Sequence, residues 1–131
     1  MSIDRITIET LVGTKISNID LYQKAFTHKS VLKEDPTLTG SFETLEFIGD
    51  SVLGFVITKF LYDKYEDRQE GFLTKARTKL VRGEPLAGIA SKLELYKWIR
   101  MDEKGMRNQW IHNPKILEDV FEALVGAIYM D

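Results

Sequence analysis

Hydrophobic residues recur at helical spacing along most of the chain, and no stretch of useful length alternates as a β-strand would. The pattern first predicts two short helices, over residues 6–12 and from Leu21 onward, with Asp20 as the N-cap of the second. Further helices are predicted over 41–65, 73–82, 86–93 and 114–130, and mobile or irregular loops over 33–40 and 101–115. The pattern is therefore all-α, and 131 residues predict one domain spanning 1–131.

The longest predicted helix combines apolar and acidic residues in an unusual way. Ten of the seventeen residues from Leu45 to Leu61 are large and apolar and cover almost the whole circumference, which predicts a long, largely buried central helix. Three carboxylates nevertheless lie in its first turns. At about 100° per residue, Glu43, Glu46 and Asp50 fall within roughly a 60° arc and share one face.

The final predicted helix repeats this combination after a start at Asn113 and Pro114, a favourable N-cap and first-turn pair. Eleven of the fifteen residues 116–130 are apolar, yet Asp119 and Glu122 lie three positions apart on one face. A carboxylate buried without a partner is costly, and no lysine on these two helices is expected to offset the charges. The pattern therefore predicts a cation between the two acidic faces.

Small residues predict how the two helices could meet, because they permit a close approach of two backbones. They are Gly49 and Gly54 on the first helix and Ala123, Gly126 and Ala127 on the last. A ligand set made only of carboxylates favours Mg²⁺ or Mn²⁺ over zinc, and a pair of such ions is the usual device for phosphodiester hydrolysis.

A simpler interpretation of the acidic residues stays open. Glu43 and Glu46 could merely favour a helix N-terminus through the helix dipole. That explanation is weaker for Asp50, which lies about two turns into its helix, and for Glu122, whose neighbours in the sequence are apolar.

Composition narrows the possible chemistry. The chain has no cysteine and only two histidines, His28 and His112, which excludes disulfides, thiolate metal sites, cysteine nucleophiles and a three-histidine zinc site. His28 is expected to have a structural role at a helix end. No apolar stretch approaches the roughly 20 residues of a membrane helix, and the first residues lack a secretory pattern, so we expect no membrane partner and an intracellular, cytoplasmic location.

Basic residues are concentrated in the middle of the chain, although the net charge is −2. Lys75, Lys79 and Arg82 recur at helical spacing with Arg77 nearby, and no acidic residue lies between Gly71 and Gly83. This face could simply be solvated. It could also contact phosphates along an A-form RNA helix.

Four blocks of sequence resemble those of the ribonuclease III family and occur in the same order. They are AFTHKS (25–30), ETLEFIGDSVL (43–53), EGFLTKAR (70–77) and LEDVFEALVGAIY (117–129). The resemblance implies an all-α endonuclease domain over 1–131 that forms a homodimer. It also implies Mg²⁺-dependent cleavage of double-stranded RNA to 5′-phosphate and 3′-hydroxyl ends.

The same resemblance implies roles for individual residues. Catalytic metal ligands are implied at Glu46, Asp50, Asp119 and Glu122. Glu43 and Glu70 match acidic positions along the cleavage valley of the family, and Phe47 matches an aromatic dimer contact. Most family members also carry a C-terminal double-stranded-RNA-binding domain that is not recognised in this sequence, and we expect the chain to be a fragment.

Two other functions stay open at this stage. The fold could serve as a non-cleaving RNA-binding or ribosome-associated subunit, although the complete set of four carboxylates argues against that. An all-α nucleoside triphosphate pyrophosphatase also clusters acidic residues on helices, but it would not explain the order of the four blocks.

Overall fold

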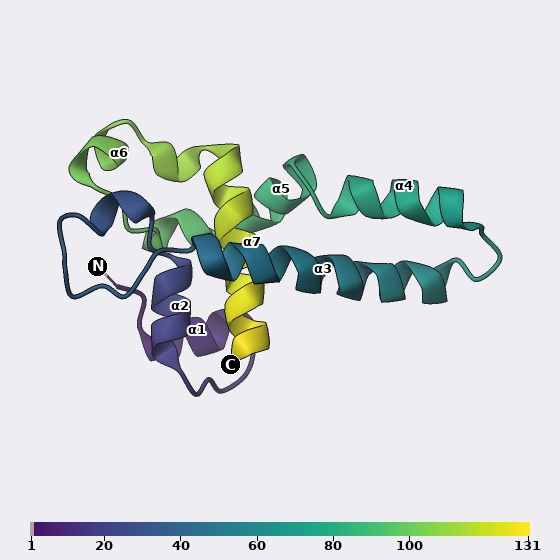
Figure 1. Cartoon of the computed structure of the whole chain (residues 1–131), viewed down its shortest axis with the longest axis horizontal. Coiled ribbons are helices and arrows are strands. Elements are labelled where there is room, and N and C mark those ends of the chain that lie inside the picture. The colour runs from purple at the N-terminus through teal and green to yellow at the C-terminus, as the bar shows by residue number, and fades with distance from the viewer. Residues whose placement is uncertain (1) are drawn as a thin grey trace.

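The computed structural model describes residues 2–131 as helices joined by short connections (Figure 1). The α-helices are α1 (Arg5–Val12), α2 (Ile19–Ala25), α3 (Glu43–Lys64), α4 (Glu70–Leu80), α5 (Glu84–Lys92), α6 (Glu103–Arg107) and α7 (Pro114–Met130). The connections contain the 3₁₀-helices η1 (Lys29–Val31), η2 (Leu95–Trp98) and η3 (Trp110–His112). Residues 2–131 form no strand, only an isolated bridge between Thr27 and Arg100, so the predicted all-α class is confirmed.

The molecule consists of a helical body and a projecting arm. In the body α7 crosses α3 near its start, and α2 and α5 also pack against α7 (Figure 1). The second half of α3 and the antiparallel α4 extend away from this body as the arm. The core of the body contains fully buried side chains from α1, α7 and the segments between them: Ile8, Phe26, Leu95 and Val120.

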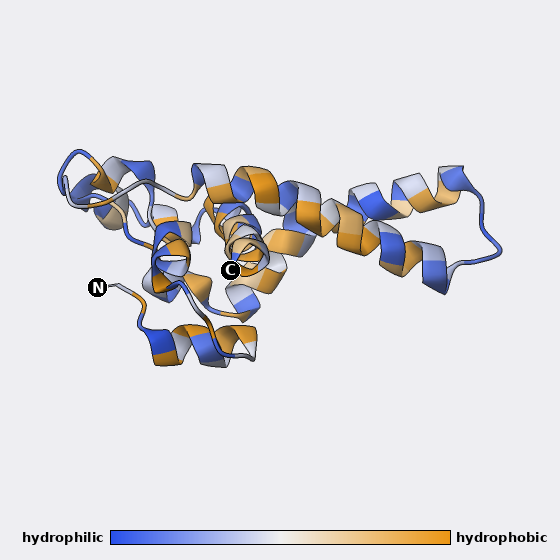
Figure 2. Ribbon diagram, turned by 60° about the horizontal axis from the view of Figure 1, so that its bottom comes forward, coloured by the Kyte–Doolittle hydropathy of each residue, from blue (hydrophilic) through white to orange (hydrophobic). Residues whose placement is uncertain are grey.

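Helix α3 is long and central, as predicted, but much of it is exposed in a single chain. Leu45, Gly49 and Leu61 are buried, whereas Phe47 and Phe55 are 81% and 74% exposed. The prediction of burial around most of the circumference is therefore wrong for one chain. One physical reason is that hydrophobic residues continue along α3 into the arm, beyond the body that could cover them (Figure 2). Phe47 lies in the first turns of α3 but is left uncovered there as well.

Some predicted boundaries also need correction. Asn18, rather than Asp20, caps α2, because its Oδ1 accepts a hydrogen bond from the Asp20 backbone N–H. The predicted loop 101–115 contains α6 and η3, and the start of α6 is fixed by a bond from the Gly105 N–H to the Asp102 carboxylate. The start of α7 agrees with the prediction, with Asn113 as its N-cap.

Helix α4 begins and ends earlier than predicted. It starts at Glu70 and its last residue is Leu80, so Arg82 lies in the turn before α5 and not on the helix. Lys75 and Lys79 therefore share a helix face that Arg82 does not continue.

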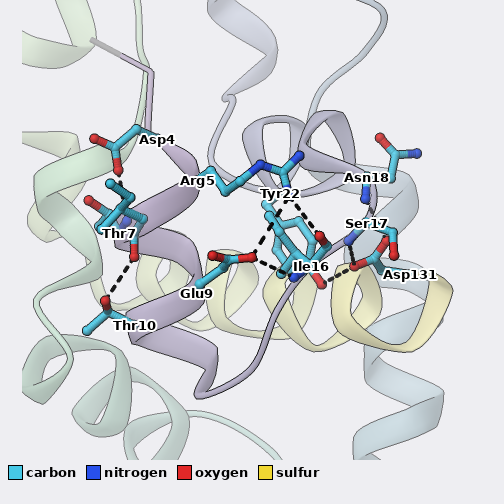
Figure 3. Close-up of polar contacts among 11 residues, drawn as sticks. Asp4, Arg5, Thr7, Glu9, Thr10, Ile16, Ser17, Asn18, Tyr22 and Asp131 are labelled. Carbon is cyan, nitrogen blue, oxygen red and sulfur yellow. Dashed lines mark hydrogen bonds and ion pairs between the residues drawn. The ribbon is translucent and has the colours of Figure 1, made fainter.

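A polar cluster fastens the end of α7 to the segment between α1 and α2 (Figure 3). The Asp131 carboxylate accepts hydrogen bonds from the backbone N–H groups of Ser17 and Asn18 and from the Tyr22 hydroxyl, at 3.0, 2.8 and 3.0 Å. Burial and this carboxylate raise the pKa of Tyr22 to about 12. The direction in which α7 leaves the crossing is thus fixed at its far end as well.

Candidate active site

Two glycines bring the backbones of α3 and α7 into contact. A Cβ atom on Gly49 would lie 1.7 Å from the Glu122 carbonyl oxygen, and one on Gly126 would lie 2.1 Å from the Leu45 carbonyl oxygen. No side chain larger than hydrogen fits at either position without separating the helices. Gly54 was predicted to share this role, but it lies beyond the crossing and a Cβ there would meet nothing within 4 Å.

The crossing brings carboxylates from both helices together. One oxygen each from Glu46, Asp119 and Glu122 lie within 4.8 Å of one another. Glu46 and Asp119 are half-buried, and Glu122 is buried. Asp50 lies outside this group of three but lines the same cavity as Glu46 and Glu122. All four residues implied as metal ligands therefore converge on one region.

Burial, together with the proximity of these groups, makes ionisation of Glu46 and Glu122 unfavourable. Burial, followed by the negative charge of Asp119, raises the pKa of Glu46 to about 7. Burial and the neighbouring Asp50 carboxylate raise the pKa of Glu122 to about 8. Both shifts have the direction expected for crowded carboxylates that lack sufficient positive charge.

Lys115 corrects the expectation that no lysine on these helices offsets the acidic residues. Its Nζ lies 2.9 Å from Asp119 Oδ1 and 3.7 Å from Glu118 Oε1. The pKa of Lys115 is raised, and its contact with Asp119 is the main cause. One lysine, however, cannot neutralise Glu46, Asp119 and Glu122 together.

The residues that converge here fit a divalent cation. Asp119 Oδ1 is buried, forms an ion pair with Lys115 Nζ at 2.9 Å, and accepts no further hydrogen bond from residues 2–131. This single ammonium group faces several crowded carboxylates. The donors are carboxylates alone, which is the chemistry that Mg²⁺ and Mn²⁺ prefer.

The acidic residues open to solvent through a cavity of about 460 Å³. Glu43, Phe47 and Asp50 from α3 line it together with Arg82 and Lys115. Two positively charged side chains, Arg82 and Lys115, therefore line the same cavity as the acidic centre. This arrangement suits a ligand that carries negative charge and approaches a bound cation.

His28 belongs to a smaller cavity of about 180 Å³ that Glu46 and Asp119 also line. Its Nδ1 accepts a hydrogen bond from the Ser30 backbone N–H at 3.1 Å and so caps η1. Burial lowers its pKa. These contacts agree with a structural role at a helix end.

The other predicted substrate contacts lie away from the acidic cavity. Glu70 and Arg77 line a separate cavity of about 440 Å³ between α3 and α4, and Arg77 donates a hydrogen bond to the Thr58 hydroxyl at 3.1 Å. Lys75 and Lys79 are exposed on α4. Of the four basic residues predicted to bind phosphate, only Arg82 lines the acidic cavity.

Sequence reasoning missed Lys115 and Glu118 as members of the site. Both line the acidic cavity. The signal was present in the sequence, because positions 115, 118 and 119 are spaced as neighbours on one helix face. Extending the acidic face of the predicted helix by one turn toward its N-terminus would have included both residues.

Comparisons with known proteins agree with this geometry. The family model described as Ribonuclease-III-like matches residues 18–131. The chain is 44% identical to a protein of Paramecium bursaria Chlorella virus 1 over 124 residues, which are 95% of this chain and 44% of that protein. It is 43% identical to Ribonuclease 3 of Francisella philomiragia over 122 residues, which are 92% of this chain and 49% of that protein. The chain thus spans about half the length of these curated relatives.

The fold is also similar to that of solved structures. The nuclease domain of ribonuclease III from Campylobacter jejuni superposes with a TM-score of 0.87 at 33% identity, covering 97% of this chain and 85% of that one. The resemblance inferred from the four sequence blocks is thus confirmed. Separately, no helix within residues 2–131 is long and apolar enough to cross a membrane.

The glycine contact at the crossing predicts a large effect of one methyl group. Gly49→Ala is expected to lower the free energy of unfolding by about 3 kcal/mol, because its Cβ would force α3 and α7 apart. Gly88→Ala is the matched control, since Gly88 is an exposed residue within α5 whose Cβ would meet nothing within 4 Å. It should leave stability unchanged or raise it by up to about 1 kcal/mol. Urea unfolding measures the stability of both variants. Equal stabilities of Gly49→Ala and Gly88→Ala would contradict the close backbone contact proposed for Gly49.

The raised pKa of Glu122 predicts how stability without metal depends on pH. A carboxyl group whose pKa rises on folding disfavours the folded state increasingly as the pH rises from about 4.5 to about 8. Glu122→Gln removes this charge and should therefore raise the melting temperature in chelator at pH 8 more than at pH 5.

In Mg²⁺ at pH 8 the wild-type protein should have the higher melting temperature and Glu122→Gln the lower one. The ion stabilises the native wild-type protein, whereas the variant lacks one of its ligands. Glu103→Gln, an exposed change on α6, is the control for loss of a negative charge. If Mg²⁺ leaves the melting temperature of the wild-type protein unchanged, the residues do not form a metal site.

Proposed function

Because the chain belongs to the ribonuclease III family, we propose that it is the nuclease domain of an endoribonuclease that cleaves double-stranded RNA to 5′-phosphate and 3′-hydroxyl products. The observation that carries this proposal is the convergence of carboxylate oxygens from Glu46, Asp119 and Glu122 within 4.8 Å, with Asp50 beside them. In this proposal Glu46, Asp50, Asp119 and Glu122 hold Mg²⁺, with Mn²⁺ as a substitute.

The chemistry requires no side chain as the nucleophile. When bound, a pair of divalent ions supplies an activated water and stabilises the leaving 3′ oxygen. The chain's own residues bind and orient: the four carboxylates hold the cations, and Glu43 lines the mouth of the cavity. Arg82 and Lys115 supply positive charge where a phosphodiester would enter.

Basic residues of α4 are proposed to bind the duplex outside the cavity. Lys75 and Lys79 are exposed on α4, and Arg77 is held against α3 by its bond to Thr58. A-form RNA presents its phosphates and 2′-hydroxyl groups across a shallow minor groove, which suits contacts spread along a helix. Glu70, at the start of α4, is proposed to lie along the path of the RNA.

A homodimer is the second part of the proposal. Large apolar residues are exposed along α3 from the body into the arm: Phe47, Phe55, Val56, Phe60 and Tyr62. So many large apolar side chains exposed on one helix are typical of a protein interface. The description of the Campylobacter jejuni structure refers to a region involved in dimer formation. Phe47 is proposed as a dimer contact.

Two further parts of the proposal concern the setting of the activity. We place it inside the cell, in the cytoplasm, where a processing enzyme would meet duplex RNA. A double-stranded-RNA-binding domain outside this chain stays a prediction, since the curated relatives are about twice as long as the region they share with it.

Cleavage of a long RNA duplex tests the activity. We expect short products with 5′-phosphate ends in Mg²⁺, and none with Ca²⁺ or chelator. Glu122→Gln should lower the cleavage rate by orders of magnitude while duplex binding in Ca²⁺ is largely kept, because the ligand is lost but the basic surface is not. Single-stranded RNA and a DNA duplex of the same sequence are the substrate controls. Full activity of the variant in Mg²⁺ would refute the assignment, and binding without cleavage by the wild-type protein would favour a non-cleaving subunit.

Sedimentation equilibrium tests the dimer. Phe47→Ala should weaken self-association by about tenfold or more, because a large exposed aromatic residue is the usual anchor of such an interface. Ile6→Ala, which truncates an exposed apolar residue on α1, should leave the dimer unchanged. A wild-type chain that stays monomeric at high concentration would contradict the proposal.

A further inference from the structure

Glu118 links α7 to the turn that precedes α5. Its Oε2 accepts a hydrogen bond from the Gly83 backbone N–H at 2.8 Å, although the two residues are 35 positions apart. Its Oε1 lies 3.7 Å from the Nζ of Lys115, and the residue is 9% exposed. Glu118 does not belong to the group of three carboxylates whose oxygens converge. Its carboxylate therefore contacts the Gly83 turn and Lys115 rather than the converging oxygens.

The Glu118 bond is made to a glycine in an unusual backbone conformation. Gly83 has φ +67° and ψ −135°, a conformation that favours glycine, and it begins α5 without a side-chain cap. The N–H that it donates belongs to the peptide unit that joins it to Arg82. Because that unit is planar, the bond to Glu118 fixes the orientation of the Arg82 carbonyl as well as that of the Gly83 N–H. A hydrogen bond to a charged acceptor is stronger than a neutral one.

Arg82 is the basic residue whose position matters most for the acidic cavity. It lines this cavity with Glu46, Asp50 and Glu122, yet it forms no ion pair with any residue of 2–131. Its side chain is long and exposed. In a turn that could rotate freely, the guanidinium would be drawn onto the carboxylates by their charge. The guanidinium would then compete with a bound cation and would no longer be available to contact the substrate.

We propose that Glu118 is a positioning residue that holds Arg82 at the rim of the acidic cavity, where the guanidinium meets an RNA phosphate. Two features carry this inference: the bond from Gly83 to the Glu118 carboxylate and the shared cavity of Arg82 and the acidic centre. The inference rests on the proposed function, because it assigns a contact within the same site.

Simple electrostatics and the positioning role predict opposite effects of removing this carboxylate. Loss of a negative charge near the RNA path should strengthen binding of a polyanion. Loss of the tether should weaken it, because Arg82 no longer holds its phosphate. Glu118→Ala removes both the charge and the acceptor, whereas Glu118→Gln removes the charge and keeps a carbonyl oxygen for the Gly83 N–H.

The experiment measures affinity of the whole chain for an RNA duplex in Ca²⁺ at several salt concentrations. We expect Arg82→Ala and Glu118→Ala each to weaken binding by roughly fivefold and to lower the slope of log affinity against log salt by about 1. Glu118→Gln should bind within about twofold of the wild-type protein. The double variant should bind no more weakly than Arg82→Ala alone, since both changes remove one contact.

Controls separate positioning from loss of structure. Glu103→Ala removes an exposed glutamate on α6 and should leave affinity and slope unchanged. If Glu118→Ala does not fold, Glu118→Asp takes its place in the same cycle, because it keeps the charge but withdraws the acceptor by one methylene. The same loss of affinity is then expected.

Several outcomes would overturn the inference. Glu118→Ala could bind as tightly as the wild-type protein or more tightly, its effect could add fully to that of Arg82→Ala, or Glu118→Gln could lose as much affinity as Glu118→Ala. A wild-type chain that binds no RNA duplex would instead refute the proposed function. If the wild-type chain binds the duplex normally but the effects of Glu118→Ala and Arg82→Ala add fully, the positioning role is refuted and the proposed function is not.

Discussion

The backbone contact between α3 and α7 determines where every group of the candidate site lies. Gly49 meets the Glu122 carbonyl, and Gly126 meets that of Leu45, so the acidic turns of the two helices are held face to face. Glu46 lies one turn before Gly49, and Glu122 one turn before Gly126. A larger residue at either glycine would separate the backbones and with them the carboxylates. Close packing and metal chemistry are therefore encoded in the same few turns.

Local signals explain which parts of the fold could be predicted from the sequence. The bounds of α7 follow from Asn113, Pro114 and an apolar run, and they match the structure. The convergence of the acidic residues could be predicted because charge is costly on helices that are otherwise apolar. The residue at which α4 ends could not, since Arg82 lies in the turn and the adjacent Gly83 bonds Glu118, a distant contact that no local pattern reveals. Lys115 was overlooked because its partner oxygens are identified only once α7 is oriented.

The exposure of α3 shows a different limit of sequence patterns. Apolar residues around a helix indicate that its surface is covered, but they do not indicate by which chain. α7 covers Leu45 and Gly49, whereas Phe47 and Phe55 are left largely exposed in a single chain. The same apolar pattern thus describes a helix with one partner inside the chain and, in our proposal, a second partner outside it.

The acidic centre opposes the stability of the fold that contains it. Burial and crowding raise the pKa values of Glu46 and Glu122, and Lys115 compensates only part of the charge. A core designed for stability alone would replace these residues with apolar ones of similar size. Because they lie beside the close backbone contact of α3 and α7, the rest of this interface must tolerate the repulsion. Such a conflict between local stability and charge is characteristic of sites selected for chemistry, and a divalent cation bound by these oxygens would remove it.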